Sequence, residues 1–132
     1  MNDLYKFIVE NYKKLSSSEV LDISQQQCNN LMIMTNNLLQ RNINFWSDAI
    51  IKEYSNRIQY YAEINSFITI TKRGENEPYY RKNALERINY LVETIQKETE
   101  TIFLNADMAK RQNIIEEIYI PHLLLKYTIL NI

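Results

Sequence analysis

The chain has 132 residues, of which 45% are hydrophobic and 23% are charged, as expected for one globular domain with a hydrophobic core. Its single Gly and two Pro disfavour a β-rich fold, because tight turns between strands draw heavily on both residues. A net charge of −1 lacks the basic excess of most nucleic-acid-binding domains, and the single cysteine excludes an internal disulfide and fits a reducing compartment.

Helical periodicity dominates the first half of the chain. Residues 3–15 predict a first helix, and Ser18, followed by two acids in the next four residues, predicts the N-cap of a second that fades near residue 40. Cys28 falls on the apolar face of this second helix, which favours a buried structural thiol over a reactive one. A third helix is predicted over about residues 47–71.

The second half predicts two more helices separated by clear breaks. Residues 72–78 contain the only Gly and one of the two Pro, which makes this segment the strongest turn signal in the chain. A fourth helix follows over about residues 79–103, and the polar run at 97–101 predicts a bend or a division. The fifth runs from about residue 108 to the end, where Pro121 predicts a kink or a split because it lacks a backbone N–H group.

These elements predict an all-α fold. About five helices, three of them long, are joined by short connections, so sequential neighbours are expected to pack antiparallel. We therefore expect residues 1–132 to form a single all-α domain resembling a segment of an irregular α-solenoid, or a fragment of a longer one.

Residues that could carry chemistry are few. A single Gly excludes a Gly-rich phosphate loop, and neither HExxH nor Glu-x-x-His occurs. His122, the only histidine, lies among apolar residues and is predicted to be half-buried with a ring nitrogen bonded to a backbone group. We predict no catalytic, cofactor-binding or metal-binding residues, no small-molecule substrate and no enzymatic activity.

Two tyrosine pairs have basic residues nearby. Such pairs can form stacking platforms for single-stranded nucleic acid, but Glu63, Glu75 and Glu77 lie close to them in the sequence. Packing in the core or at a protein interface is the favoured interpretation, because Tyr buries a large area while keeping a polar tip. The pairs are Tyr60–Tyr61 and Tyr79–Tyr80.

Residues 114–132, IIEEIYIPHLLLKYTILNI, are apolar on nearly all sides. A helix of this kind must be buried on most sides, and one shared core cannot cover all of them, so an exposed protein interface is expected. This expected interface consists of Leu123, Leu125, Ile129 and Ile132. A partner could cover it, or further helices of a longer stack; the absence of a polar tail and a C-cap favours the second. Charged residues interrupt the segment, so no membrane span is predicted.

Two stretches carry a resemblance to a known family. These are ALERINYLVETIQKETETIFL (residues 84–104) and IIEEIYIPHLLLKY (residues 114–127). With the helix before them, they resemble the C-terminal helical region of the stalk nucleoporin of the Y-shaped outer-ring complex, over about residues 57–127. The shared pattern of an apolar residue, an aromatic residue, Pro and two Leu falls on Ile118, Tyr119, Pro121, Leu123 and Leu124.

The resemblance implies a non-enzymatic scaffold segment that joins neighbouring outer-ring nucleoporins through helical packing. It also implies a location at the nuclear pore complex in the nuclear envelope; otherwise we expect a soluble protein of the cytoplasm or nucleus. Two alternatives stay open at this stage. One is a helical subunit or adaptor of another protein assembly, and the other is a small helical regulator that binds nucleic acid.

Overall fold

The computed structural model describes residues 3, 6–7, 10–11, 15–73, 78–105 and 119–130. Within these residues the protein is all-α, and four helices pack antiparallel, as the sequence predicts. The helices are α2 (Ser17–Asn42), α3 (Asp48–Arg73), α4 (Pro78–Asn105) and α6 (Ile120–Ile129). The predicted first helix and the early part of the fifth lie largely or wholly outside the described residues.

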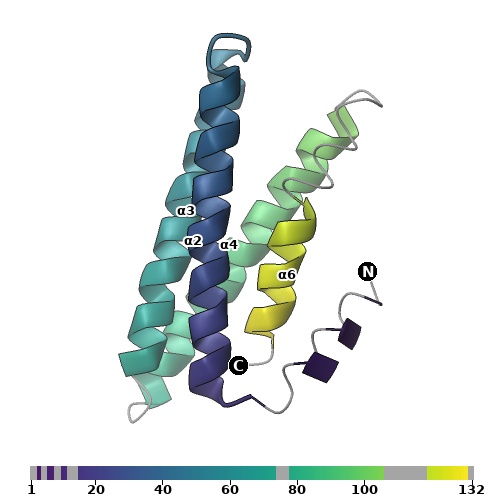
Figure 1. The fold of residues 1–132 in the computed structure, drawn as a ribbon. Coiled ribbons are helices and arrows are strands. Elements are labelled where there is room, and N and C mark those ends of the chain that lie inside the picture. Colours follow the sequence, from purple (N-terminus) through teal and green to yellow (C-terminus); the bar gives the residue numbers. More distant parts are fainter. Residues whose placement is uncertain are drawn as a thin grey trace.

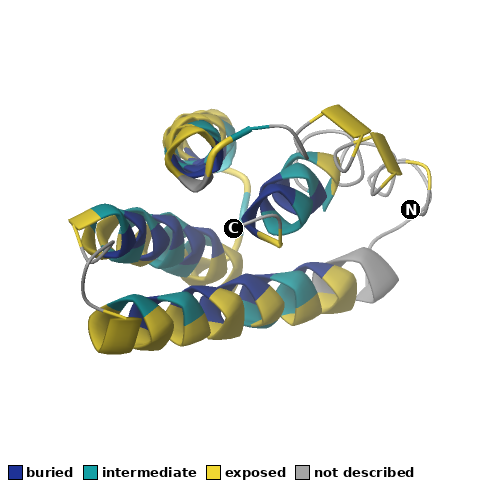
Figure 2. Cartoon of the chain, turned by 90° about the horizontal axis from the view of Figure 1, so that it is seen from below, coloured by how far each residue is buried: buried dark blue, intermediate teal, exposed yellow. Residues whose placement is uncertain are grey.

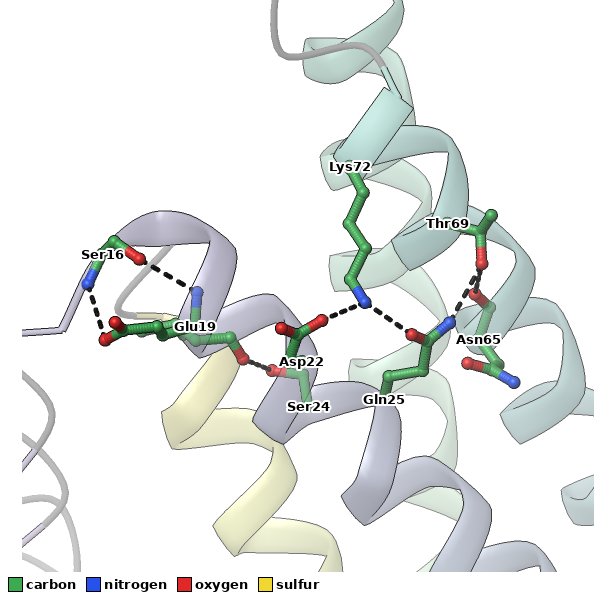
Figure 3. A network of polar contacts seen from close by, with 9 residues as sticks. Ser16, Glu19, Asp22, Ser24, Gln25, Asn65, Thr69 and Lys72 are labelled. Atoms are coloured by element: carbon green, nitrogen blue, oxygen red, sulfur yellow. Dashed lines mark hydrogen bonds and ion pairs between the residues drawn. The ribbon is translucent and has the colours of Figure 1, made fainter.

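A capping box starts α2. The Ser16 hydroxyl accepts a hydrogen bond from the Glu19 backbone N–H, and the Ser16 N–H donates to the Glu19 carboxylate, both at 3.2 Å (Figure 3). The box needs Glu or Gln three residues after the cap, and Glu19 stands there for Ser16, so Ser16 is the cap and the prediction of Ser18 was wrong. The helix ends at Asn42, whose side chain donates to the Leu38 carbonyl at 2.8 Å.

The helix α4 runs without a break from Pro78 to Asn105, so the division predicted as one alternative at residues 97–101 was wrong. Thr99 in this polar run is fully buried. Its hydroxyl donates to the Ile95 carbonyl at 2.7 Å, which satisfies the polar group within the helix. The neighbouring Lys97 and Glu100 are exposed, and a surface helix tolerates polar residues there.

The helices α2 and α3 form an antiparallel hairpin, and α4 returns along α3 before diverging from the hairpin (Figure 1). The short helix α6 packs along α2 on the side where α4 also lies (Figure 1). The end of the hairpin at residues 43–47 extends well beyond α6 (Figure 1). The helix α6 therefore covers only the part of the hairpin nearer to the start of α2.

Buried residues line the inward sides of the helices, while the outer side of α4 is exposed (Figure 2). A large cluster takes residues from all four helices, including Leu125 and Ile129 of α6. A smaller cluster at the far end of the hairpin centres on Leu39 and Tyr54 and has no residue from α4 or α6. The two clusters divide the molecule into a four-helix part and a two-helix end.

Candidate interaction surfaces and the buried polar network

The structure places the predicted C-terminal interface inside the molecule. Leu123, Leu125 and Ile129 are 1%, 0% and 4% exposed, and Ile132 lies outside the described residues. Because α6 lies against α2 and its side chains also reach α4 and α3, one short helix is covered on several sides at once. These three side chains therefore pack within the chain and form no open surface.

His122 connects α6 to two other helices. Its Nε2 lies 3.0 Å from the Val92 carbonyl of α4, and its Nδ1 lies 2.8 Å from the Tyr61 hydroxyl of α3. A carbonyl can only accept, so Nε2 carries the proton and Nδ1 accepts from Tyr61. The predicted backbone bond is confirmed, but the side chain is fully rather than half-buried, and no pattern in the sequence indicated the Tyr61 contact.

The His122 ring is neutral because of its surroundings. Burial lowers its pKa to about 3, an effect that the hydrogen bond to Val92 opposes and that the positive charges of Arg57 and Lys126 reinforce. Burial also raises the pKa of Tyr61. Both groups are therefore uncharged near pH 7, and their hydrogen bonds join helices without introducing a buried charge.

Arg57 is a charged side chain in the core, 1% exposed. Its Nη2 donates to the Ile95 carbonyl at 3.3 Å and to the Thr99 hydroxyl, and its Cζ lies 5.9 Å from the centre of the Tyr54 ring. Its Nη1 has no hydrogen-bond partner among the described residues. Burying a guanidinium costs free energy even when it is well bonded, so the burial of Arg57 carries an energetic cost at the contact between α3 and α4.

The polar groups of the core are placed for packing. Cys28 is fully buried and burial raises the pKa of its thiol to about 12, which agrees with the predicted structural role. Across the part of the chain that the structure describes, no three His, Cys, Asp or Glu side chains lie together as a metal site would require. The hydrogen bonds of Arg57 and His122 connect helices.

An exposed apolar surface does occur at the far end of the hairpin. We call it the tip patch: Ile43, Phe45 and Ile50, which are 43%, 84% and 39% exposed. Beneath it, Trp46 stacks on Tyr54 with ring centres 4.6 Å apart. No surface was predicted between the second and third helices. The signal in the sequence was Ile43, Phe45 and Trp46 in a turn, where polar residues are usual.

The tyrosines of the two pairs differ in their exposure to solvent. Tyr61 is 1% exposed and lies in the core, which confirms the packing interpretation for that residue. Tyr79 and Tyr80 are 73% and 58% exposed, with ring centres 5.7 Å apart in an edge-on arrangement. They lie at the start of α4, at the opposite end of α3 from the tip patch. They are exposed aromatic residues outside that patch.

No family model, curated protein or solved structure matches this chain. The resemblance to the stalk nucleoporin therefore stays a prediction. Of the helices in the described residues, none has the length and apolar character needed to cross a membrane.

Proposed function

We propose that this protein is a non-enzymatic helical scaffold that works by binding another protein through the tip patch. The hairpin of α2 and α3 carries the patch away from the four-helix part of the molecule. The partner would cover Phe45 together with the flanking Ile43 and Ile50. The role of the chain is then to hold that contact at a fixed position relative to the rest of the fold.

The exposure of Phe45 carries this proposal. A single exposed apolar residue is ordinary, but here an aromatic side chain that is 84% exposed lies between two partly exposed isoleucines in one connection. Aromatic residues near the centre of a patch are the usual anchors of protein interfaces. The Trp46–Tyr54 stack supports the turn from below, so the patch is presented on a packed base.

The specific form of this proposal is a scaffold segment of the nuclear pore outer ring that joins neighbouring nucleoporins. It rests on the resemblance of residues 57–127 and on the all-α antiparallel packing that such a segment requires. The tip patch lies outside the resembling residues. The choice of partner and the existence of the surface are therefore separate questions, and one experiment can address both.

The test is affinity capture of the tagged chain from an extract of its own organism, with quantitative mass spectrometry. Three versions are compared: wild type, Phe45→Ser and Tyr79→Ser. Both substitutions remove an exposed aromatic ring, one at the tip and one at the opposite end of the hairpin. The proposal expects a defined protein to be captured by the wild type and the Tyr79 variant, and to be depleted at least about tenfold by the Phe45 variant.

The identity of the captured protein then decides the specific form. Outer-ring nucleoporins that depend on Phe45 would support the nuclear pore assignment. A different assembly that depends on Phe45 would support the scaffold role and reject the resemblance. Equal capture by all three versions would reject the tip patch as the binding surface.

A further inference from the structure

The outward face of α2 is uncharged over most of its length. Residues 23–40 contain no Asp, Glu, Lys, Arg or His. Eight of these residues are exposed, and all are amides or apolar side chains. We call them the amide face: Gln26, Asn29, Asn30, Ile33, Met34, Asn36, Asn37 and Gln40.

The amide face differs in charge from the exposed side of α4. The exposed residues of α4 include Lys82, Glu86, Arg87, Glu93 and Lys97, the mixed charges of an ordinary solvated helix. Ile33 is 59% exposed and Met34 is 38% exposed, near the middle of the length of the amide face. Depletion of charge and an exposed Met are features that this face shares with the core of protein interfaces.

We propose that the amide face binds the same face of a second copy of this chain, with the two α2 helices antiparallel. An uncharged face can meet itself without bringing like charges together, and side-chain amides both donate and accept, so Asn and Gln can pair with their own kind. In a two-fold dimer the same surface supplies both halves of the contact. The amide face meets each of these requirements.

The charges at the two ends of the amide face set the orientation. Asp22 lies just before it and Arg41 just after it. Antiparallel pairing places Asp22 of each copy beside Arg41 of the other, whereas parallel pairing places like charges together. The helix dipoles favour the same orientation. Asp22 also pairs with Lys72 of its own chain (Figure 3), but it is 64% exposed and can accept a second cation.

The register follows from this pairing. When Asp22 meets Arg41, the two-fold axis passes midway between them, between positions 31 and 32. Ile33 then lies within one turn of the axis and Gln26 faces Asn37 of the second copy, because 26 and 37 have the same midpoint as 22 and 41. The most exposed apolar residue of the amide face is thus covered at the centre of the contact, where binding energy concentrates.

The expected dimer is of modest affinity. Residues 23–40 span about 27 Å of helix, and a standard stable interface buries about 800 Å² on each partner, which is more than one helix face supplies. The test is therefore a concentration series of the full chain, followed by sedimentation equilibrium. We expect a reversible monomer–dimer equilibrium, and a chain that stays monomeric to its solubility limit would overturn the proposal.

Matched isoleucine variants locate the contact. Ile33→Glu introduces two like charges close to the two-fold axis and should weaken the dimer at least about tenfold. Ile70→Glu makes the same change on α3, at a side chain that is 43% exposed, and should leave it intact. Circular dichroism checks that both variants fold. A dimer that survives Ile33→Glu, or that is lost equally in both folded variants, would overturn the assignment to the amide face.

A charge pair tests the orientation. In the antiparallel dimer the double variant Gln26→Lys with Asn37→Glu gains two opposite-charge contacts and should bind more tightly than wild type at low salt. In a parallel dimer each new charge meets its own copy, so binding should weaken. Tighter binding that high salt removes supports the antiparallel arrangement, and weaker binding of the folded double variant overturns it.

Discussion

Two apolar segments of this protein differ in their exposure to solvent. The turn that carries the tip patch leaves Phe45 84% exposed, whereas α6 buries Leu123 and Leu125 to 1% and 0% exposure. Both segments are rich in apolar residues, and α6 is the more apolar of the two. The difference lies in what surrounds them, because α6 packs against helices of its own chain and the hairpin end extends beyond them (Figure 1).

Polar contacts reinforce the difference. Besides the His122 contacts, Lys126 of α6 donates to Gln96 at 2.7 Å and pairs with Glu93 at 2.9 Å, both on α4. The Thr128 hydroxyl is satisfied inside α6 by the Leu124 carbonyl at 2.7 Å. The tip patch has an aromatic stack beneath it, and the hydrogen bonds of its turn in the described residues stay within the hairpin, as from the Phe45 N–H to the Asn42 carbonyl at 2.9 Å. Directional bonds thus fix α6 in one place, whereas the tip patch is left available for contact.

The largest effect on stability is expected from a charge placed in α6, the buried segment. Leu125→Asp puts an unpaired carboxylate at a fully buried position and should lower the free energy of unfolding by about 3–5 kcal/mol. That is a large part of the stability of a typical domain. Ile43→Asp, at a 43% exposed position, should change it by less than about 0.5 kcal/mol. Urea denaturation followed by circular dichroism measures both; equal losses would contradict the contrast.

The next largest effect is a dependence on pH. His122 has a pKa of about 3 in the folded protein and about 6.5 when unfolded. Between these values the unfolded chain binds a proton that the folded chain does not, so stability is lost as the pH falls from about 6.5 towards 3. The slope approaches about 1.4 kcal/mol per pH unit, or roughly 2–3 kcal/mol over two units. Urea midpoints measured from pH 7 to pH 4 test this.

Other groups also titrate in this range, so the control is the slope of a variant that cannot protonate at this position. His122→Gln is expected to be less stable than wild type at pH 7, but its stability should fall less steeply with acid. Parallel pH profiles for the two proteins would show that His122 is not the group responsible. The comparison uses slopes, so the stability lost through poorer packing of Gln does not affect it.

A smaller effect on stability is expected from removing the Tyr61 hydroxyl, which contacts His122. Tyr61→Phe leaves the ring in the core but removes the donor to His122 Nδ1, so a buried acceptor loses its partner. The expected loss is about 1–2 kcal/mol. Tyr80→Phe is the matched control, because its side chain is 58% exposed, and it should have no measurable effect. A neutral Tyr61→Phe would mean that the hydroxyl adds nothing to the attachment of α6.

Much of the fold was predictable because helical periodicity is a local property. Predicted boundaries of 47–71 for the third helix and about 79–103 for the fourth lie within a few residues of Asp48–Arg73 and Pro78–Asn105. The position of α6 was not predictable in the same way. Its apolar sides required covering surfaces, but the sequence does not say whether those surfaces come from the same chain.

The buried polar residues show a second limit. The buried stripe of α3 passes through Tyr54, Arg57 and Tyr61, whereas a search for apolar residues selects Ile58 in place of Arg57. Position 57 has the correct spacing for the core, but a charged residue is excluded by any argument from hydrophobicity. Thr99 was misjudged for the same reason. Buried polar groups are accepted where hydrogen-bond partners exist. Arg57 finds its partners on α4, and the Thr99 hydroxyl donates to a carbonyl of its own helix.

The smallest effect on stability is expected at the tip patch, and it tests whether that patch is a surface at all. Phe45→Ala removes a ring that is 84% exposed and should change the free energy of unfolding by less than about 0.5 kcal/mol. Trp46→Ala, at the adjacent residue, removes the stack on Tyr54 and should cost about 1–2 kcal/mol. If urea denaturation instead shows that Phe45→Ala costs as much as Trp46→Ala, the Phe45 ring packs within the chain. The tip would then resemble α6, and the binding surface would have to lie elsewhere.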